Sequence, residues 1–513
     1  MAVQMRRRLY KISKRIHKYI GLICLLWFLL MGISGVLINH PALIRGISVP
    51  TLFVPTGFHY KNWNRMAMKE AVYSEQTPKT LFVGGRMGVW QSKDGGRTFS
   101  PMDKGYPSSA FDQDTNCLLL TRRNGKEVLY AGNRAGLFTW DFHTREWTQI
   151  NHKEVNGMGV KDIVLIQDHP LVFTPRGCFR IEESKQHPTL SPMPLRLDTL
   201  PLQTVPMVIF MLRIHDGSIL GLPGKLFIDA LGLGLIFMSL SAMGLWYLPW
   251  RRKRSHKRPK DAHFYRWMLK YHLKIGIYSI LFLLVITLTG VIIRPPFRQP
   301  ITDKTVPSSW VKFDEFAGNR YPEIRRALYL EKKNALLLAT KVGFFMGPAD
   351  FSQPFILTPM EIPVSGMGVN VLEPLSGDRM LVGSFNGLYI KNLLSGTVTD
   401  AFAKNGLSDS HSKKRGKNRA VGAGVYKGNL QFWVDYRRGV MPAGLEGVFP
   451  IIPKAPNYST RMSLWLYLRA VHTGQIFKGF LGKYTWLLIP AGGLFLLSSL
   501  LTGGYDWLYR RKK

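Results

Sequence analysis

Four histidines recur at matching positions in the two halves of this 513-residue chain. His17 and His272 each open an apolar run, "HKYIGLICLLWFLLMGISG" and "HLKIGIYSILFLLVITLTG". His215 and His472 each precede a later run, in "HDGSILGLPGK" and "HTGQIFKGFLGK". A neutral imidazole is a suitable axial ligand of haem iron, and two imidazoles from different helices can bracket one porphyrin. The repeated residues therefore make these four histidines candidate haem ligands.

Small residues follow the first histidine pair at equal distances. Gly21 and Gly276 lie one helical turn later, where they would leave room for a macrocycle. The steps Ser34-Gly35 and Thr289-Gly290 begin 17 positions after their histidines, although small residues are also ordinary helix-packing positions. A histidine at a helix end can equally be an interfacial residue of the aromatic-belt type, so that interpretation stays open. Repetition in register favours ligation, because an interfacial role does not require it.

Other histidines fit the pattern less well. His40, at the outer end of the first apolar run, has no counterpart in the second half, where Pro295 stands. It is a reserve candidate for an outer ligand. His256 and His263 are expected to belong to a basic loop.

The charge is concentrated beside the apolar runs. The chain has 69 Lys and Arg against 32 Asp and Glu, and the dense basic runs begin at Arg6, Arg251 and Arg510. This placement is typical of cytoplasmic flanks of membrane helices and excludes a nucleic-acid-binding surface as the best explanation. The lipid bilayer is therefore the expected partner, and both termini are expected in the cytoplasm.

Uncharged runs of about 20 residues predict four membrane helices. They extend over residues 19–38, 230–250, 275–293 and 484–505. The first is expected to be a retained anchor, since no small-x-small cleavage site follows it. The predicted segments are a cytoplasmic N-terminus with the first span (1–40), an external β-rich segment (41–225), the second span (226–250), a cytoplasmic loop with the start of the third helix (251–274), the third span (275–293), a second external segment (294–480), and the fourth span with the C-terminus (481–513).

The chain is a tandem repeat of helix, external segment and helix. The stretches "LYKISKRIHKYIG" and "FYRWMLKYHLKIG" align without a gap, and "GLWYLPWRRKR" parallels "GGYDWLYRRKK". Two copies with the same orientation predict a four-helix transmembrane bundle with a pseudo-twofold axis along the membrane normal.

A shorter β-type repeat occupies the external segments. "LFVGGRMGVW", "LYAGNRAGLF" and "MLVGSFNGLY" share two glycines followed by an aliphatic and an aromatic residue, and weaker copies begin at residues 171, 337 and 430. Repeats of this length are typical of propeller blades, so the two segments could together form one split β-propeller. "SKDGGRTF" resembles an Asp-box, in which Asp94 would bond nearby backbone. Cys117 and Cys178 could form a disulfide or remain two thiols; Cys24 lies in a predicted span.

The histidine motifs and the tail "TGGYDWLYRRKK" resemble the PepSY-associated transmembrane family of bacterial iron-regulated proteins. Its members include inner-membrane reductases that carry haems between helices and reduce ferric siderophores in the periplasm. The resemblance implies two haem b groups held by His17, His215, His272 and His472, and an inner-membrane location with periplasmic external domains. The sequence departs from the family in one respect, because propeller-like repeats occupy the external segments, where family members commonly have small PepSY domains.

The first expectation is thus a transmembrane reductase of a ferric siderophore or another ferric chelate. The loop from Arg251 to Asp261 is too short for a nucleotide-binding unit, so a cytoplasmic or membrane electron donor is expected. The alternative is a membrane-anchored propeller-type sensor or binding protein without redox chemistry. A transporter is not favoured, because the predicted spans contain no ionisable residues to mark an ion path. A hydrolase is not favoured either, because no motif places a nucleophile beside a base.

Overall fold

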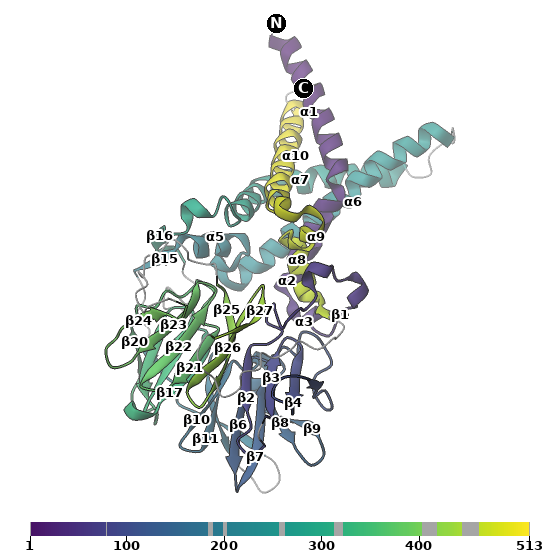
Figure 1. The fold of residues 1–513 in the computed structure, drawn as a ribbon. Coiled ribbons are helices and arrows are strands. Elements are labelled where there is room, and N and C mark those ends of the chain that lie inside the picture. The colour runs from purple at the N-terminus through teal and green to yellow at the C-terminus, as the bar shows by residue number, and fades with distance from the viewer. Residues whose placement is uncertain are drawn as a thin grey trace.

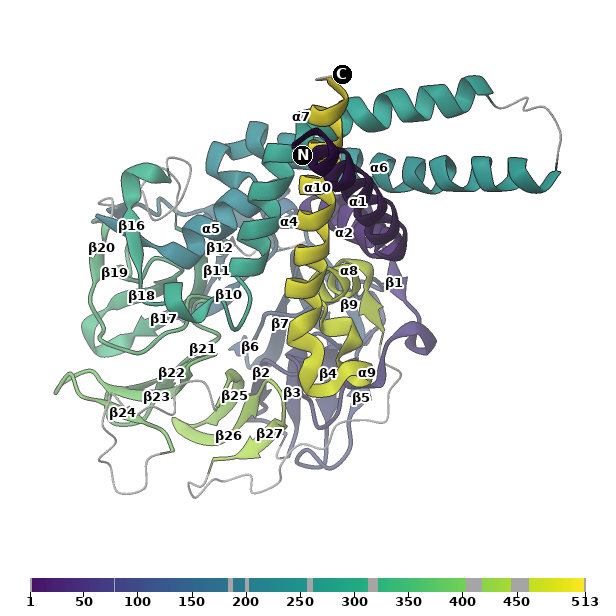
Figure 2. The same ribbon diagram turned by 90° about the horizontal axis from the view of Figure 1, so that it is seen from above.

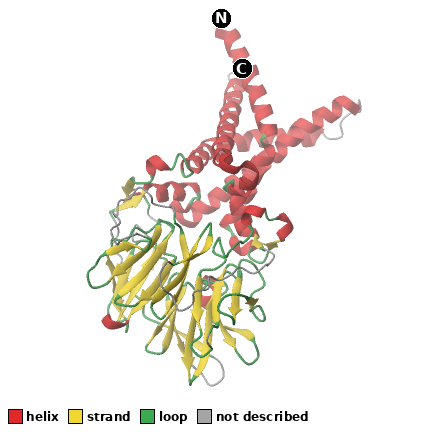
Figure 3. Ribbon diagram, viewed as in Figure 1, coloured by secondary structure: helices red, strands yellow, loops and turns green. Residues whose placement is uncertain are grey.

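The computed structural model describes residues 2–77, 79–182, 188–198, 203–255, 262–311, 322–402, 418–443 and 461–511. Long helices gather at one end of the molecule and strands at the other (Figures 1 and 3). Figure 1 shows both chain ends at the helical end, far from the strands. His256, which is expected to belong to the basic loop, lies outside the described residues, as do residues 411–417 of the basic run that begins at His411.

In the described chain, three helices are long and apolar enough to cross a membrane, and a fourth crossing exists if one bent pair counts as a span. The three are α6 (Gly221–Ser255), α7 (Ala262–Ile292) and α10 (Leu488–Arg511). The bent pair is α1 (Ala2–Ile23) and α2 (Leu25–Asn39), which meet at an angle of 62°.

The span expected over residues 19–38 is present as a bent pair and not as one straight helix, since the helix is divided at Cys24. The reason is packing: α1 lies along α10, whereas α2 packs against α6 and against α8 (Leu464–His472). Helices α1 and α10 form one arm and α6 and α7 a second, and the arms diverge in both views (Figures 1 and 2). The expected four-helix bundle is not confirmed.

The strands form six consecutive antiparallel groups within the described residues. These are β2–β5 (Glu70–Tyr73, Leu81–Gly85, Gly88–Ser92, Ser100–Pro101), β6–β9 (Cys117–Arg123, Lys126–Gly132, Leu137–Asp141, Glu146–Ile150), β10–β13 (Asp162–Ile166, His169–Phe173, Cys178–Glu182, Thr189–Pro192), β17–β20 (Ile324–Leu330, Ala335–Thr340, Phe344–Pro348, Phe355–Thr358), β21–β24 (Val371–Leu375, Arg379–Ser384, Gly387–Asn392, Val398–Asp400) and β25–β27 (Ala420–Tyr426, Asn429–Asp435, Gly439–Pro442).

The first strands of these groups meet in a closed sequence. Strand β2 contacts β6, and contacts continue from β6 to β10, β17, β21 and β25. Strand β25 then pairs in parallel with β2, so the last group joins the first. Figure 2 shows the groups in this succession. The two long segments between the apolar helices thus build one β-rich domain.

Short elements link the two segments on the side of the helices. Strand β1 (Ser48–Val49) pairs with β28 (Met462–Ser463), and β15 (Thr204–Pro206) pairs with β16 (Thr305–Pro307). Strand β14 (Leu197–Asp198) adds a parallel edge to β20. Helix α5 (Met207–His215) follows β15, and α8 follows β28.

The six β-type repeats of the sequence coincide with the second and third strands of the six groups. In the three stronger repeats the first glycine is needed for packing between groups. A Cβ at Gly132 would lie 2.4 Å from Cγ1 of Val160, just before β10, and one at Gly383 would lie 3.0 Å from Cβ of Ala420 in β25. The first glycine of these repeats therefore marks positions where neighbouring strand groups approach closely.

The Asp-box prediction is confirmed in the turn between β4 and β5. The Asp94 carboxylate accepts hydrogen bonds from the backbone N–H groups of Arg97 and Thr98 at 3.0 and 2.9 Å. Gly95 and Gly96 have φ angles of 75° and 89°, which favour glycine. No disulfide forms between Cys117 and Cys178, which are both buried free thiols.

A buried ion cluster joins the two segments among the first strands. Arg326 of β17 places Nη1 at 3.1 Å from Glu70 Oε2 and 3.4 Å from Asp162 Oδ1. The other Asp162 oxygen accepts the backbone N–H of Ala327 at 2.8 Å. Because Arg326 and Asp162 are almost fully buried, these contacts fix strands that are distant in the chain.

Candidate functional site

The four candidate histidines form two facing pairs. The ring centres of His17 on α1 and His272 on α7 lie 6.3 Å apart, with the ring planes at 83°. Those of His215 on α5 and His472 on α8 lie 6.2 Å apart, at 58°. We call the first the inner pair, because it lies along the long helices, and the second the outer pair, because α5 and α8 lie beside the β-rich domain (Figure 1).

This spacing suits two imidazoles on opposite sides of one metal ion. An imidazole nitrogen binds a first-row metal at about 2 Å, and the ring centre lies about 1 Å beyond the nitrogen. Two such rings across one ion have centres about 6 Å apart. Both pairs meet this requirement although neither pair makes a direct hydrogen bond in the described structure.

Each histidine of the inner pair is oriented through Nδ1. His17 Nδ1 donates to the backbone oxygen of Ser499 on α10 at 2.9 Å. His272 Nδ1 lies 2.8 Å from the hydroxyl oxygen of Ser241 on α6. The Ser241 hydroxyl donates its own proton to Met238 O at 3.1 Å, so it accepts from the histidine.

The outer pair follows the same rule. His215 Nδ1 donates to the backbone oxygen of Ile286 on α7 at 3.0 Å. His472 Nδ1 lies 2.9 Å from the hydroxyl oxygen of Ser34 on α2. Because the Ser34 hydroxyl donates to Leu30 O, it accepts from His472. In all four histidines Nδ1 thus carries a proton, so in the neutral form Nε2 keeps the lone pair that a metal ligand needs.

The partners come from opposite halves of the repeat. His17 and His215, from the first half, are held by α10 and α7 of the second half. His272 and His472, from the second half, are held by α6 and α2 of the first half. Each pair therefore straddles the interface between the two halves, as expected for sites on a pseudo-twofold axis.

A cavity of about 510 Å³ adjoins the inner pair. Its walls are mostly apolar and include Gly21 and Gly276 with both histidines. A Cβ at Gly21 would meet nothing within 4 Å, and one at Gly276 would reach only Met238 Sδ at 3.7 Å. The volume and lining are those of a site for a large apolar cofactor.

The Ser-Gly and Thr-Gly steps lie against the outer pair. A Cβ at Gly35 would be 3.5 Å from Cε1 of His472, and one at Gly290 would be 2.8 Å from Cε1 of His215. Gly503 on α10 has the same relation to His17, at 2.9 Å. Gly35 and Gly290, which follow the inner histidines in the sequence, therefore lie against the outer histidines in the structure.

Sequence reasoning missed Ser241, Ser499 and Gly503, because they lie in the second and fourth spans, where the repeat is less regular. Their small side chains within apolar runs were the available signal. His40 is placed elsewhere: its Nε2 lies 2.8 Å from Asp229 Oδ2, so it is a hydrogen-bond partner of Asp229 at the outer end of α2. His263 lies in the first turn of α7.

A family model described as the PepSY-associated TM region matches residues 2–248 and again residues 193–510. The two matches overlap over residues 193–248 and together cover almost the whole chain. No curated protein shows significant sequence similarity to the chain.

Among solved structures, the chain is similar to extracellular domains from B. thetaiotaomicron. One, described as belonging to the one component system BT4673, has a TM-score of 0.36 and 11% identity, over 75% of this chain and 34% of that one. Another, described as belonging to the hybrid two component system BT3049, has a TM-score of 0.32 and 10% identity, over 74% of this chain and 39% of that one. The chain thus spans little more than a third of each of these domains. TM-scores this low do not establish a shared fold.

Proposed function

Because the chain belongs to the PepSY-associated transmembrane family and brings four histidines into two facing pairs, we propose that it is a haem-containing electron-transfer protein. It would bind two haem b groups and reduce a ferric siderophore or another ferric chelate outside the membrane. The observation that carries this proposal is the common geometry of the pairs, about 6 Å between ring centres with every Nδ1 hydrogen-bonded.

The residues divide the work as follows. His17 and His272 would bind one haem iron, and His215 and His472 the other, while Gly21 and Gly276 leave room for the macrocycle. Each histidine pair would supply two nitrogen ligands, and a bound haem would supply the one-electron chemistry. The Nδ1 hydrogen bonds hold the rings in orientation and make Nε2 a better ligand.

The chemistry on the outer side is a one-electron reduction. Chelated Fe³⁺ takes up one electron and becomes Fe²⁺, which oxygen-donor chelators bind far less strongly. A cytoplasmic or membrane donor must supply each electron. The family match and the apolar helices support a membrane protein.

The basic residues support an orientation with the β-rich domain in the periplasm. Arg6 to Arg8 begin α1, Arg251 and Arg252 end α6, and Arg510 and Arg511 end α10. All three clusters lie at the ends of helices that point away from the strands (Figure 1). By the positive-inside rule these ends are cytoplasmic. We also propose that the six strand groups are blades of one split propeller, supported by the closure of β25 on β2.

An optical spectrum of the detergent-purified full chain, with haem quantified before and after dithionite, tests the proposal. We expect a Soret band that shifts on reduction and about two haems per chain. Single His→Ala variants of His17 and His472 should each remove one haem, and His40→Ala should remove none. A chain without haem, isolated from haem-replete cells, would instead support the binding or sensor function.

A further inference from the structure

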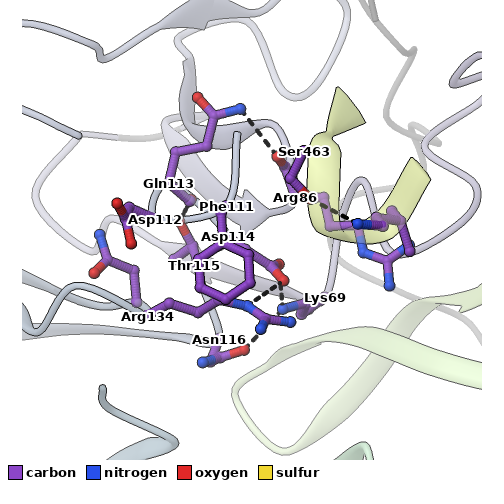
Figure 4. Close-up of polar contacts among 12 residues, drawn as sticks. Lys69, Arg86, Phe111, Asp112, Gln113, Asp114, Thr115, Asn116, Arg134 and Ser463 are labelled. Carbon is purple, nitrogen blue, oxygen red and sulfur yellow. Dashed lines mark hydrogen bonds and ion pairs between the residues drawn. The ribbon is translucent and has the colours of Figure 1, made fainter. Parts of the chain in front are cut away.

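Cationic side chains gather where the β-rich domain meets α8. A small cavity of about 20 Å³ lies there, and its lining includes Arg86, Arg134, Arg461, Asp114 and Trp465. Figure 4 shows Arg86, Arg134, Lys69 and Asp114 around this space. Arg86 follows β3, Arg134 follows β7, and Trp465 lies on α8, so three distant parts of the chain build the cluster.

The cluster has a net positive charge. Asp114 is already bound on both oxygens, by Lys69 Nζ at 2.6 Å and by Arg134 Nε at 3.1 Å. In the part of the chain that the structure describes, no carboxylate forms an ion pair with Arg86, Arg461 or Arg469. Asp114 also acts on Arg86, whose pKa it raises against the effect of burial. Asp114 is, however, the one carboxylate among the described residues that line the cavity with Arg86, Arg134 and Arg461, so the cluster keeps a net positive charge.

The positive charges of the cluster also affect the pKa of the neighbouring Tyr436. Burial alone would raise the pKa of Tyr436, but the charges of Arg86 and Arg65 outweigh it and lower the pKa below its ordinary value. Burial and the positive charges nearby, that of Arg86 first among them, also lower the pKa of Arg469. An anion entering the cluster would relieve this repulsion.

Aromatic rings hold two of the guanidinium groups in place. Arg134 and Arg469 lie 5.6 and 5.5 Å from the ring centre of Trp465, and Arg134 lies 4.6 Å from that of Phe111. Trp465 Nε1 donates to Ile38 O at 3.2 Å, which ties the platform to the end of α2. Preorganised, planar guanidinium groups are the usual receptors for carboxylates.

The cluster adjoins the outer histidine pair along two helices. Arg469 is three residues before His472 on α8, so both lie on one face of that helix. Arg294 is four residues after Gly290, whose Cβ position touches the His215 ring. Burial and the positive charges of Arg469 and Arg298 lower the pKa of Arg294 to about 10, so Arg294 belongs to the same positive field.

We propose that this cluster is the docking site for an anionic, carboxylate-bearing ferric chelate, which one carboxylate anchors in the cavity while the metal lies toward the outer pair. The inference rests on the proposed function, because it names the substrate class of that same outer site. A neutral or cationic chelate would gain nothing from Arg86, Arg461 and Arg469.

Isothermal titration of the full chain with gallium(III) citrate tests this site without redox chemistry. The protein is held in nanodiscs of neutral phosphatidylcholine. We expect saturable binding that weakens as sodium chloride is raised, and about tenfold weaker binding for Arg86→Gln and for Arg469→Gln. Arg97→Gln is the matched control. Arg97 is exposed and follows the C-terminal end of β4, whereas Arg86 precedes the N-terminal end of that strand.

The outcomes separate the inference from the proposed function. Equal affinity of wild type, Arg86→Gln and Arg469→Gln would overturn the docking site, even for a protein with two haems. Specific binding to a haem-free chain would support the site and contradict the reductase function. Loss of citrate binding in anionic phosphatidylglycerol nanodiscs would show that lipid headgroups occupy the cluster, which also overturns the proposal.

Discussion

Ser34 accepts a hydrogen bond from Nδ1 of His472 at 2.9 Å, although 438 positions separate the two residues in the chain. The serine comes from α2 of the first half and the histidine from α8 of the second. The Ser34 hydroxyl proton is directed to Leu30 O, so the histidine must be the donor. The contact therefore decides both the orientation and the tautomer of a proposed haem ligand.

Replacing this serine should weaken the outer site selectively. In Ser34→Ala the Nδ1–H of His472 loses its acceptor, and we expect haem retention at the outer site to fall about tenfold or more. Haem content and the reduced spectrum of the purified chain measure the effect. Ser498→Ala is the control, since Ser498 is half-buried on α10 and its hydroxyl donates to Leu494 O and not to a histidine. An unchanged haem content in Ser34→Ala would contradict the assigned role.

Two glycines offer a matched steric comparison at the outer pair. The Cβ of Gly290→Ala would lie 2.8 Å from Cε1 of His215, closer than real Cβ contacts, so the ring must shift. The Cβ of Gly35→Ala would lie 3.5 Å from Cε1 of His472, an ordinary contact. We expect Gly290→Ala to lose one haem and Gly35→Ala to keep both. Equal haem content in the two variants would be evidence against this geometry.

The buried arginine among the first strands should dominate the stability of the β-rich domain. Arg326→Met leaves Glu70 and Asp162 without their shared cation, and we expect the free energy of unfolding to fall by about 3–5 kcal/mol. Chemical denaturation followed by tryptophan fluorescence measures the change. Arg379→Met, at an exposed arginine bonded to Ser376 O, should change stability by less than about 0.5 kcal/mol. A similar loss in both variants would refute the special role of the cluster.

Glu323 should make stability depend on acid pH. Burial would raise its pKa, but the charges of Arg325, Lys161 and Lys341 outweigh this and lower the pKa from its ordinary value of 4.5 to about 2. Because the folded state releases this proton more readily, the stabilisation is complete above about pH 4.5 and is lost as the pH falls toward 2.

The comparison with Glu323→Gln isolates this contribution. At pH 7 we expect the variant to be less stable by about 2 kcal/mol, with the difference narrowing below about pH 4.5. Denaturant titrations of both proteins from pH 7 to pH 3 provide the measurement. Glu75→Gln is the control, because the Glu75–Arg122 pair is exposed. A difference that stayed constant with pH would exclude the titration of Glu323 as its cause.

Local patterns in the sequence determined much of this protein. The apolar runs predicted α6, α7 and α10, the repeat predicted two related halves, and the glycine motifs predicted six β-hairpins. The recurrence of His17, His215, His272 and His472 singled out the candidate ligands. These signals were readable because hydropathy, turn chemistry and internal repetition are properties of neighbouring residues.

Tertiary structure decided the rest. Contacts between distant segments decide the division of α1 from α2 and the hydrogen bond of His40 to Asp229. They also bring Arg86, Arg134 and Trp465 together. The exchange of histidine partners between halves was equally hidden, because sequence spacing relates residues along one helix but not across helices. Packing energy, summed over both halves, selects which helices meet, and only that choice places Ser34 beneath His472.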